Sequence, residues 1–199
     1  MTPRRQPRVP VRPAARKTAA RARVARTAAA RPPATGKAAL PVMRVGLGFD
    51  IHPLAGGRKL MIGGVEIPSH SGPDGHSDGD PLLHALTDAL LGAAGLGDIG
   101  QHFSDRDPRW QGAASSLFVK ETLRHLRHDD YEIMNMDCNI ILEEPKLAPF
   151  IGTIRRSIAE LLEIGMERVS VKAKRHEGLD SLGRAEAIAA QCVVLLVKR

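Results

Sequence analysis

The stretch that most constrains the fold is an alternating run near residue 50. Odd positions carry large apolar side chains and even positions carry glycine or a polar group, in the order Val45, Gly46, Leu47, Gly48, Phe49, Asp50, Ile51 and His52. Such alternation is typical of a β-strand, whose successive side chains point to opposite faces of a sheet. The strand therefore holds Asp50 and His52 side by side, on the face where the two glycines let another segment come close.

A helix is predicted to start at Asp80. Asp is a favourable N-cap, and the proline that follows it loses nothing by lacking an N–H at the first helical position. The helix is predicted over residues 81–94, with Gly95 as its C-terminal stop. His84 and Asp88 lie four residues apart on one side of it. Its apolar face is formed by Leu83, Leu86, Leu90 and Ala94.

Two imidazoles and one carboxylate, from His52, His84 and Asp50, are the ligand set of a catalytic zinc site, which keeps a fourth position open. Each histidine alone has an ordinary alternative, as the solvated end of a strand or as a half-buried partner of Asp88. The acidic, glycine-bearing loop between the two segments favours the metal site. We predict a site for Zn²⁺ or another divalent transition metal, with Asp88 accepting a hydrogen bond from His84 and so orienting its ring.

These residues resemble the signature of the 2-C-methyl-D-erythritol 2,4-cyclodiphosphate synthases of the non-mevalonate isoprenoid pathway. The resemblance rests on Gly-Phe-Asp-Ile-His at 48–52, His-Ser-Asp-Gly-Asp at 76–80 and Leu-Gly-Asp-Ile-Gly at 96–100, and it continues from Met43 to Lys198. It implies a phosphorus-oxygen lyase that converts 4-diphosphocytidyl-2-C-methyl-D-erythritol 2-phosphate to the cyclic diphosphate and releases CMP, by metal-assisted intramolecular phosphoryl transfer. It also implies homotrimers whose sheets meet around an axis and whose active sites lie between chains.

The resemblance extends to individual side chains. It implies catalytic roles for Asp50, His52, His84 and Glu177, of which Glu177 holds a second ion, Mg²⁺ or Mn²⁺. It places Arg184 and Glu186 near the cavity on the trimer axis. It implies substrate contacts from the following residues: His76, Ser77, Asp98, Gly100, Phe103, Asp105, Lys146, Ala173, Lys174 and Arg175.

The chain departs from the family pattern between residues 172 and 186. Lys174 and Arg175 replace threonines that meet the nucleotide phosphates, and Ser181 replaces a phenylalanine that lines the axial cavity, next to the acidic Asp180. A cation can neutralise a phosphate where a hydroxyl donated a hydrogen bond, although a long side chain positions it less closely. Phosphate binding is compatible with the change, whereas the cavity loses apolar lining.

The positive charge of the chain belongs to its first 42 residues. The formal net charge is +7, but residues 1–42 hold 11 Lys or Arg and no acid, so residues 43–199 hold 18 basic against 22 acidic residues, or −4. An Ala-, Arg- and Pro-rich segment buries too little apolar surface to fold, so residues 1–42 are predicted to be a disordered extension. It is interpreted as a solvated tail, an arm for nucleic acid or ribosomes, a transit peptide, or a segment ahead of a true start at Met43.

Residues 43–199 predict one catalytic domain of the α/β class, α+β in type, with a mixed sheet of about four strands plus a hairpin and with helices on one face. The hairpin is expected at residues 59–68, around Gly-Gly, followed by a polar loop from Ser69 to Gly79. Helices are expected at 116–128 and at 150–164, the latter ended by Gly165. Strands are expected at 131–142, with Met134 and Met136 in the core, at 169–173, and at 185–197, buried on both faces.

Composition sets the expected compartment and partners. Cys138 and Cys192 are the only cysteines and have no C-x-x-C spacing, which fits a reducing cytoplasm, or a plastid if residues 1–42 are a transit peptide. No stretch is long and apolar enough to cross a membrane. The small-molecule partner implied is the cytidine diphosphate-linked substrate.

Two other functions remain open at this point. A metal-dependent phosphohydrolase would use the same metal to activate water and would release a linear product. A nucleic-acid-associated protein would use the basic tail and the cluster Lys172, Lys174, Arg175 and His176. Residues 43–199 are net acidic and poor in aromatic residues, which argues against this function except through the tail.

Overall fold

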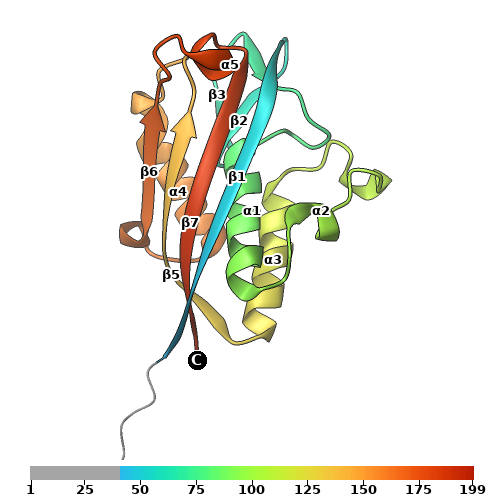
Figure 1. Ribbon diagram of the computed structural model, residues 1–199, viewed down its shortest axis with the longest axis vertical. Coiled ribbons are helices and arrows are strands. Elements are labelled where there is room, and N and C mark those ends of the chain that lie inside the picture. The colour runs from blue at the N-terminus through green and yellow to red at the C-terminus, as the bar shows by residue number, and fades with distance from the viewer. Residues whose placement is uncertain (1–40) are drawn as a thin grey trace, which may run out of the picture. The chain divides into compact units, whose positions relative to one another are not determined.

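The computed structural model describes residues 41–199 (Figure 1). A five-stranded sheet with the order β4-β1-β7-β5-β6 forms its centre, and β2 and β3 form a separate hairpin. The strands are β1 (Val42–Gly56), β2 (Leu60–Ile62), β3 (Val65–Ile67), β4 (Ser71–Pro73), β5 (Tyr131–Ile141), β6 (Val169–Lys174) and β7 (Ala187–Lys198). Only β5 and β6 pair in parallel, so the sheet is mixed, as predicted.

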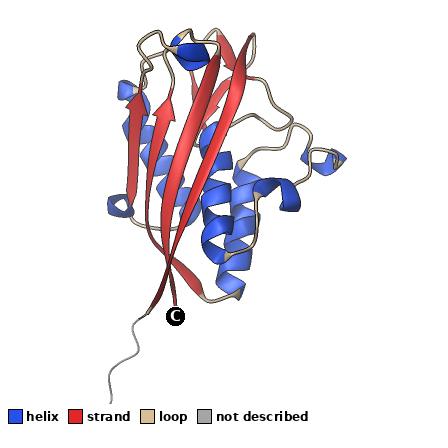
Figure 2. Cartoon of the chain, viewed as in Figure 1, coloured by secondary structure: helices blue, strands red, loops and turns tan. Residues whose placement is uncertain are grey.

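Three long helices cover one face of the sheet and close the core (Figure 2). They are α1 (Pro81–Ala94), α3 (Ser116–His128) and α4 (Ile151–Leu162). The shorter elements are α2 (Ile99–His102), α5 (Asp180–Gly183), η1 (Pro108–Trp110), η2 (Ala148–Phe150) and η3 (Met166–Arg168). None of the helices in residues 41–199 is long and apolar enough to cross a membrane. The predicted extension at residues 1–42 lies outside the described residues but for its last two.

Two glycines allow α1 to lie directly on β1. A Cβ atom at Gly46 would come within 1.9 Å of the Ala89 carbonyl oxygen, and one at Gly48 within 1.9 Å of the Ala85 carbonyl oxygen. The polar face of the predicted strand is therefore the face that meets the helix. This contact brings the first turn of α1 beside Asp50.

The opposite face of β1 is apolar and uncovered in the single chain. Val45, Leu47 and Phe49 are 69%, 60% and 53% exposed. The prediction that residues 185–197 are buried on both faces is correct only at Ala187–Ala190, where Leu182 of α5 packs on the outer face. Further along β7, Val193 is exposed on that face, next to the exposed apolar side chains of β1.

The helix and hairpin predictions are largely confirmed. α1 and α3 occupy the predicted residues, with Asp80 as N-cap and Gly95 as the left-handed C-cap of α1. The hairpin turns at Gly63 and Gly64, whose positive φ values of 61° and 76° are those a tight primed turn requires. The fold thus contains the elements that the periodicity of the sequence predicts, at or close to their predicted ends.

Three details of the prediction are wrong. The sheet has five strands because β4 forms inside the predicted loop from Ser69 to Gly79 and pairs with the end of β1. Met134 is exposed because a register shift between Ile133 and Asn135 turns it away from the core. Helix α4 is shorter than its predicted range at both ends. The 3-10 helix η2 precedes it, and Glu163, with a left-handed φ of 57°, ends it two residues before Gly165.

Candidate functional site

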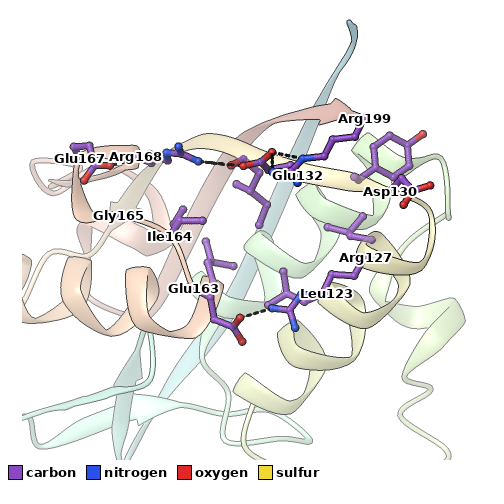
Figure 3. A pocket seen from close by; sticks show the side chains of 14 residues that line it. Leu123, Arg127, Asp130, Glu132, Glu163, Ile164, Gly165, Glu167, Arg168 and Arg199 are labelled. Carbon is purple, nitrogen blue, oxygen red and sulfur yellow. Dashed lines mark hydrogen bonds and ion pairs between the residues drawn. The ribbon is translucent and has the colours of Figure 1, made fainter.

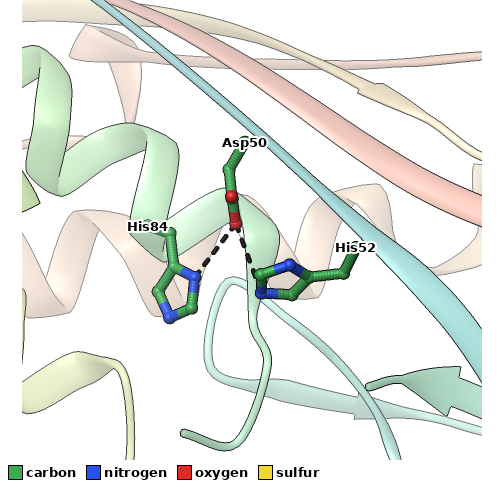
Figure 4. Close-up of side chains that lie close together, drawn as sticks. All are labelled: Asp50, His52 and His84. Atoms are coloured by element: carbon green, nitrogen blue, oxygen red, sulfur yellow. Dashed lines mark hydrogen bonds and ion pairs between the residues drawn. The ribbon is translucent and has the colours of Figure 1, made fainter. Parts of the chain in front are cut away.

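The three predicted metal ligands converge (Figure 4). Asp50 and His52 project from β1 towards α1, and His84 projects from the first turn of α1. Asp50 Oδ2 lies 2.9 Å from His84 Nδ1 and 3.5 Å from His52 Nε2. One ligand atom from each side chain fits within 4.8 Å of the others, which suits a divalent metal ion.

The hydrogen bonds of His52 show that this arrangement fits a cation. His52 Nδ1 lies 2.9 Å from the Ile51 carbonyl oxygen, which can only accept, so Nδ1 carries the proton and Nε2 holds a lone pair. His52 Nε2 is buried and has no hydrogen-bond partner in the described residues. A buried lone pair beside a carboxylate is costly unless a positive ion lies between them. The donor set of one carboxylate and two imidazoles fits a zinc-like ion.

Asp80 fixes the helix that carries His84. Its carboxylate accepts hydrogen bonds from the N–H groups of Leu82 and Leu83, as an N-cap does, and from Gly64 N of the hairpin turn at 2.7 Å. Complete burial raises the pKa of Asp80 above its ordinary value, although the N–H groups of Gly64 and Leu83 act in the opposite direction. The role of helix cap predicted for Asp80 is confirmed, and its second function is to tie the hairpin to α1.

A polar network meets the other ring nitrogen of His84. His84 Nε2 lies 3.0 Å from Ser77 Oγ and 2.9 Å from Ser115 Oγ. Asp78 accepts hydrogen bonds from the backbone N–H and the hydroxyl of Ser115. His84 thus has polar neighbours on both sides, Asp50 Oδ2 at Nδ1 and two hydroxyl groups at Nε2.

The metal centre opens into a cavity of about 390 Å³. Aromatic side chains form one wall of the cavity: Phe103 and Phe118 stack with ring centroids 4.8 Å apart, and Trp110 packs edge-on against both. The cavity is lined by Asp50, His52, His76, Ser77, His84, Ile99, Gly100, Phe103, Asp105, Trp110 and Phe118. Such a cavity, with polar groups beside an aromatic wall, suits a small ligand that carries both polar and apolar groups.

The structure brings five of the predicted substrate contacts to this cavity, namely His76, Ser77, Gly100, Phe103 and Asp105. Asp98 is not one of its lining residues. Its carboxylate caps α2 and accepts hydrogen bonds from Gln101, which hold the pKa of Asp98 below its ordinary value. Asp98 therefore positions the neighbouring Gly100 from outside the cavity.

Asp88 is predicted to support His84, but no hydrogen bond joins the two side chains in the described residues. Asp88 accepts a hydrogen bond of 2.7 Å from Ile99 N and so fixes the start of α2, while burial raises its pKa. The acceptors that face His84 Nε2 are Ser77 and Ser115 instead. Spacing along one helix identified a neighbour of His84, but the partners come from loops that the spacing does not describe.

The remaining predicted contacts lie elsewhere in the single chain. Asp50 on β1, Ala190 on β7, Ile140 on β5 and Ala173 on β6 are consecutive partners in one row across the sheet. Three strand spacings therefore separate Asp50 from Ala173, or about 14 Å. Lys174, Arg175 and Glu177 follow Ala173 at that far edge, and Lys146 lines a separate recess with Glu144 and Ala185.

Ion pairs organise the far edge. Arg175 pairs with the buried carboxylate of Glu143, which raises the pKa of Arg175, and Glu143 also accepts a hydrogen bond of 3.0 Å from His176 N. Arg184 and Glu186, predicted to lie near a trimer axis, pair with each other at 2.9 Å on the surface. No carboxylate pairs with Lys174 in the part of the chain that the structure describes.

Sequence reasoning missed Ser115, Trp110, Phe118 and Glu143. Ser115 stands in an unremarkable Ala-Ala-Ser-Ser run, so nothing marks it as a partner of a histidine 31 residues away. The aromatic wall had a weak signal. The chain has only six Phe, Trp and Tyr residues, and three of them meet here.

A larger cavity, of about 500 Å³, lies between α3, α4 and the start of β5 (Figure 3). Its charged groups are largely paired with each other: Arg127 with Glu163 at 2.8 Å, and Glu132 with Arg199 at 2.5 Å and Arg168 at 3.7 Å. These pairs fasten the C-terminal residue to β5. The charged groups of this cavity therefore stabilise the fold, and the cavity is not the active-site candidate.

Comparisons with known proteins agree with this geometry. A profile of the YgbB family matches residues 43–197. A protein of Oryza sativa subsp. japonica, named as a chloroplastic 2-C-methyl-D-erythritol 2,4-cyclodiphosphate synthase, is 51% identical over 172 residues, which cover 86% of this chain and 75% of that protein. The synthase of Alkaliphilus metalliredigens is 53% identical over 152 residues, 76% of this chain and 96% of that protein.

A solved structure gives the same result for the fold. A 2C-methyl-D-erythritol-2,4-cyclodiphosphate synthase in a form with CDP bound matches with a TM-score of 0.72 at 40% identity, over 77% of this chain and 99% of that one. The match includes the sheet, the helices on one face and most of the sequence after residue 42. The chain therefore belongs to the YgbB family, the family of the 2-C-methyl-D-erythritol 2,4-cyclodiphosphate synthases.

Proposed function

We propose that the chain closes the ring of 2-C-methyl-D-erythritol 2,4-cyclodiphosphate. The 2-phosphate of 4-diphosphocytidyl-2-C-methyl-D-erythritol 2-phosphate attacks the β-phosphorus of the same molecule. A new phosphorus–oxygen bond forms, the bond to the α-phosphate breaks, and CMP leaves, which makes the enzyme a phosphorus-oxygen lyase. The observation that carries this proposal is the convergence of Asp50, His52 and His84, with an unpaired buried nitrogen, in a chain about 50% identical to named synthases.

Asp50, His52 and His84 would hold Zn²⁺ or a similar divalent ion. When bound, such an ion supplies positive charge that polarises a phosphate oxygen and offsets the repulsion between two anions. The protein then has to orient the substrate. We assign His76 and Ser77 as donors to its phosphate oxygens, and the wall formed by Phe103, Trp110 and Phe118 as the surface that packs on the methylerythritol carbons and excludes water.

No side chain has to act as the nucleophile. The attacking phosphate is already ionised near neutral pH, so positioning and charge neutralisation provide the rate enhancement. The cavity matches this requirement, because its polar groups are the three ligands, the donors His76 and Ser77, and Asp105, which can accept hydrogen bonds from substrate hydroxyl groups. Ring closure is favoured over the phosphohydrolase reaction because the relatives described above are named as synthases.

The nucleotide half of the site is proposed to come from a neighbouring chain. Lys146, Ala173, Lys174 and Arg175 would contact the cytidine diphosphate, and Glu177 would supply a carboxylate for Mg²⁺ or Mn²⁺, whose other ligands are phosphate oxygens and water. Within one chain this edge lies about 14 Å from Asp50. Head-to-tail packing of chains in a closed homotrimer brings the two halves together.

The exposed apolar face of β1 and β7 supports this assembly. Val45, Leu47, Phe49 and Val193 form an uncovered apolar stripe on the sheet, and contiguous exposed apolar side chains often mark a protein–protein contact. We propose that the sheets pack here around the trimer axis, with Arg184 and Glu186 near the axial cavity.

We place the enzyme in the cytoplasm and treat residues 1–42 as an extension to the catalytic domain of residues 43–199. Cys138 and Cys192 are both free and buried, as expected in a reducing compartment. A plastid remains the alternative, since the rice relative is named as chloroplastic and the extension is rich in arginine.

The test is phosphorus NMR of the full chain with the cytidyl diphosphate substrate, Zn²⁺ and Mg²⁺. CMP together with a cyclic diphosphate supports the synthase. CMP with a linear phosphate would show a hydrolase instead. His84→Ala should abolish both products, while His128→Ala, at the exposed end of α3, should keep them. Turnover by His84→Ala would exclude the proposed metal site.

A further inference from the structure

Ser115 is a buried polar residue that contacts His84 but is not one of the three ligands. It is completely buried at the N-terminal end of α3, and its side chain makes no capping hydrogen bond to that helix. Its hydroxyl oxygen instead lies 2.9 Å from His84 Nε2. The hydroxyl is therefore not explained by the helix that it precedes.

The direction of the hydrogen bonds follows from Asp78. A carboxylate only accepts, so Ser115 donates both its N–H, at 3.1 Å, and its hydroxyl proton to Asp78. The hydroxyl oxygen then presents only lone pairs to His84. Hence His84 donates from Nε2, so in the neutral imidazole Nδ1 is the nitrogen that keeps a lone pair, and it faces Asp50 Oδ2 at 2.9 Å.

Ser77 places a second hydroxyl oxygen at His84 Nε2 and leaves the direction of these hydrogen bonds unchanged. Ser77 Oγ accepts a hydrogen bond from Gly79 N at 3.1 Å and lies 3.0 Å from His84 Nε2. Its proton is free to be donated to Ser115 Oγ, 3.3 Å away, or to a phosphate oxygen of the substrate. Both hydroxyl oxygens therefore act as acceptors towards the same imidazole N–H.

We infer that Asp78 and Ser115 are positioning residues that fix the tautomer and orientation of His84, so that Nδ1 is the nitrogen available to a metal ion. This inference rests on the proposed function, because it concerns the same metal centre. Partners of this kind orient a ligating imidazole, and their loss weakens metal binding by about 10- to 100-fold.

The same contacts join two segments that are far apart in the sequence. Asp78 N donates to the Ala113 carbonyl oxygen at 3.0 Å, and Gly112 N donates to the His76 carbonyl oxygen at 2.8 Å. The segment that carries Trp110 is therefore anchored to the segment that carries Ser77. The orientation of His84 and the position of the aromatic wall depend on one set of hydrogen bonds.

The test uses the full-length protein and three variants. Zn²⁺ affinity is measured by competition with a chromophoric chelator, and the protonated nitrogen of His84 is identified by ¹⁵N NMR of the metal-free and zinc-loaded protein. Ser115→Ala removes the acceptor. Asp78→Asn keeps the shape but offers an N–H to Ser115, which frees the hydroxyl to donate to His84. Ser116→Ala, the next residue along, is the matched control.

Ser115→Ala and Asp78→Asn are expected to weaken Zn²⁺ binding about 10- to 100-fold. Asp78→Asn should also move the proton of metal-free His84 towards Nδ1, whereas Ser116→Ala should match the wild type. Unchanged affinity and an unchanged Nε2 proton in both variants would overturn the inference. If one variant does not fold, the other decides. A wild type that binds no zinc would defeat the proposed function, while the tautomer of metal-free His84 still tests the inference.

Discussion

A Cβ atom on residue 48 would lie 1.9 Å from the carbonyl oxygen of Ala85, so only glycine lets β1 and α1 pack as they do. Ala85 directly follows His84, and Asp50 lies two residues beyond Gly48 on the same face of β1. The contact between a glycine and a helix backbone therefore sets the distance between two of the three ligands. The metal centre depends on a position that has no side chain.

Gly48→Ala should weaken both the fold and the metal site. The added methyl group forces β1 and α1 apart, and overpacking of this kind costs about 1–3 kcal/mol of the free energy of unfolding. We expect a lower urea midpoint and weaker Zn²⁺ binding. Gly92→Ala is the control, since a Cβ atom there meets nothing within 4 Å and should add about 0.5–1 kcal/mol to helix stability. Equal stability of Gly48→Ala and wild type would contradict the packing argument.

Metal removal should lower the thermal stability of the wild type but not of His52→Ala. A ligand that binds only the folded state stabilises it by about 2.7 kcal/mol at 100 times its dissociation constant. His52 Nε2 is buried without a partner in the described residues, so its loss costs little when no metal is present. Differential scanning calorimetry with Zn²⁺ and with a chelator measures both shifts. His128→Ala should shift like the wild type, and an equal zinc shift in His52→Ala would remove His52 from the site.

The sequence predicts the elements that carry the ligands because each has a local cause. Asp80 followed by proline starts α1, Gly95 ends it, and Gly63-Gly64 turns the hairpin. Alternation near residue 50 predicts which side chains share a face. These features depend on neighbours within a few residues, so the periodicity of one chain is enough to locate them.

The partners of the ligands depend on contacts that no local pattern encodes. Ser115 contacts His84 because α3 packs against α1. Asp88 accepts a hydrogen bond from Ile99 N and not from His84, because α2 starts beside it. Met134 leaves the core through one extra residue in β5, although the alternation predicts burial. Such outcomes are set by tertiary packing, which overrides the local preference of each segment.

Asp80→Asn should gain stability relative to the wild type as pH rises. Burial raises the pKa of Asp80 above its ordinary value of 3.8, so the folded state binds this proton more tightly than the unfolded state. The contribution of Asp80 to stability is therefore fully present below pH 3.8 and is lost as pH rises through the folded pKa. Asparagine has no such proton, so the stability of the wild type minus that of the variant should fall as pH rises above about 4. Urea titrations at several pH values measure it, and a difference that grows would reverse the sign.

Lys174→Ala should raise KM more than Arg175→Ala. Lys174 is exposed, and no carboxylate pairs with it among residues 41–199, whereas Arg175 is already neutralised by Glu143. We expect roughly a tenfold rise in KM for Lys174→Ala and a smaller one for Arg175→Ala, measured by CMP release. Lys120→Ala, on the exposed surface of α3, is the control. A larger effect of Arg175 would mean that it leaves Glu143 to bind phosphate.

Two inactive variants should restore activity to each other if the site lies between chains. Glu177 and the three ligands lie on opposite edges of one chain, so a complete site needs the ligands of one chain and Glu177 of its neighbour. In a randomly mixed homotrimer of His84→Ala and Glu177→Ala chains, about one quarter of the sites contain both intact halves. Co-expression followed by a CMP-release assay should give about that fraction of wild-type activity, in particles of three times 21.5 kDa by analytical ultracentrifugation. A mixture of His84→Ala with His52→Ala should stay inactive, because both changes lie in the same half. Activity no higher than in this control would show that each chain builds its site alone.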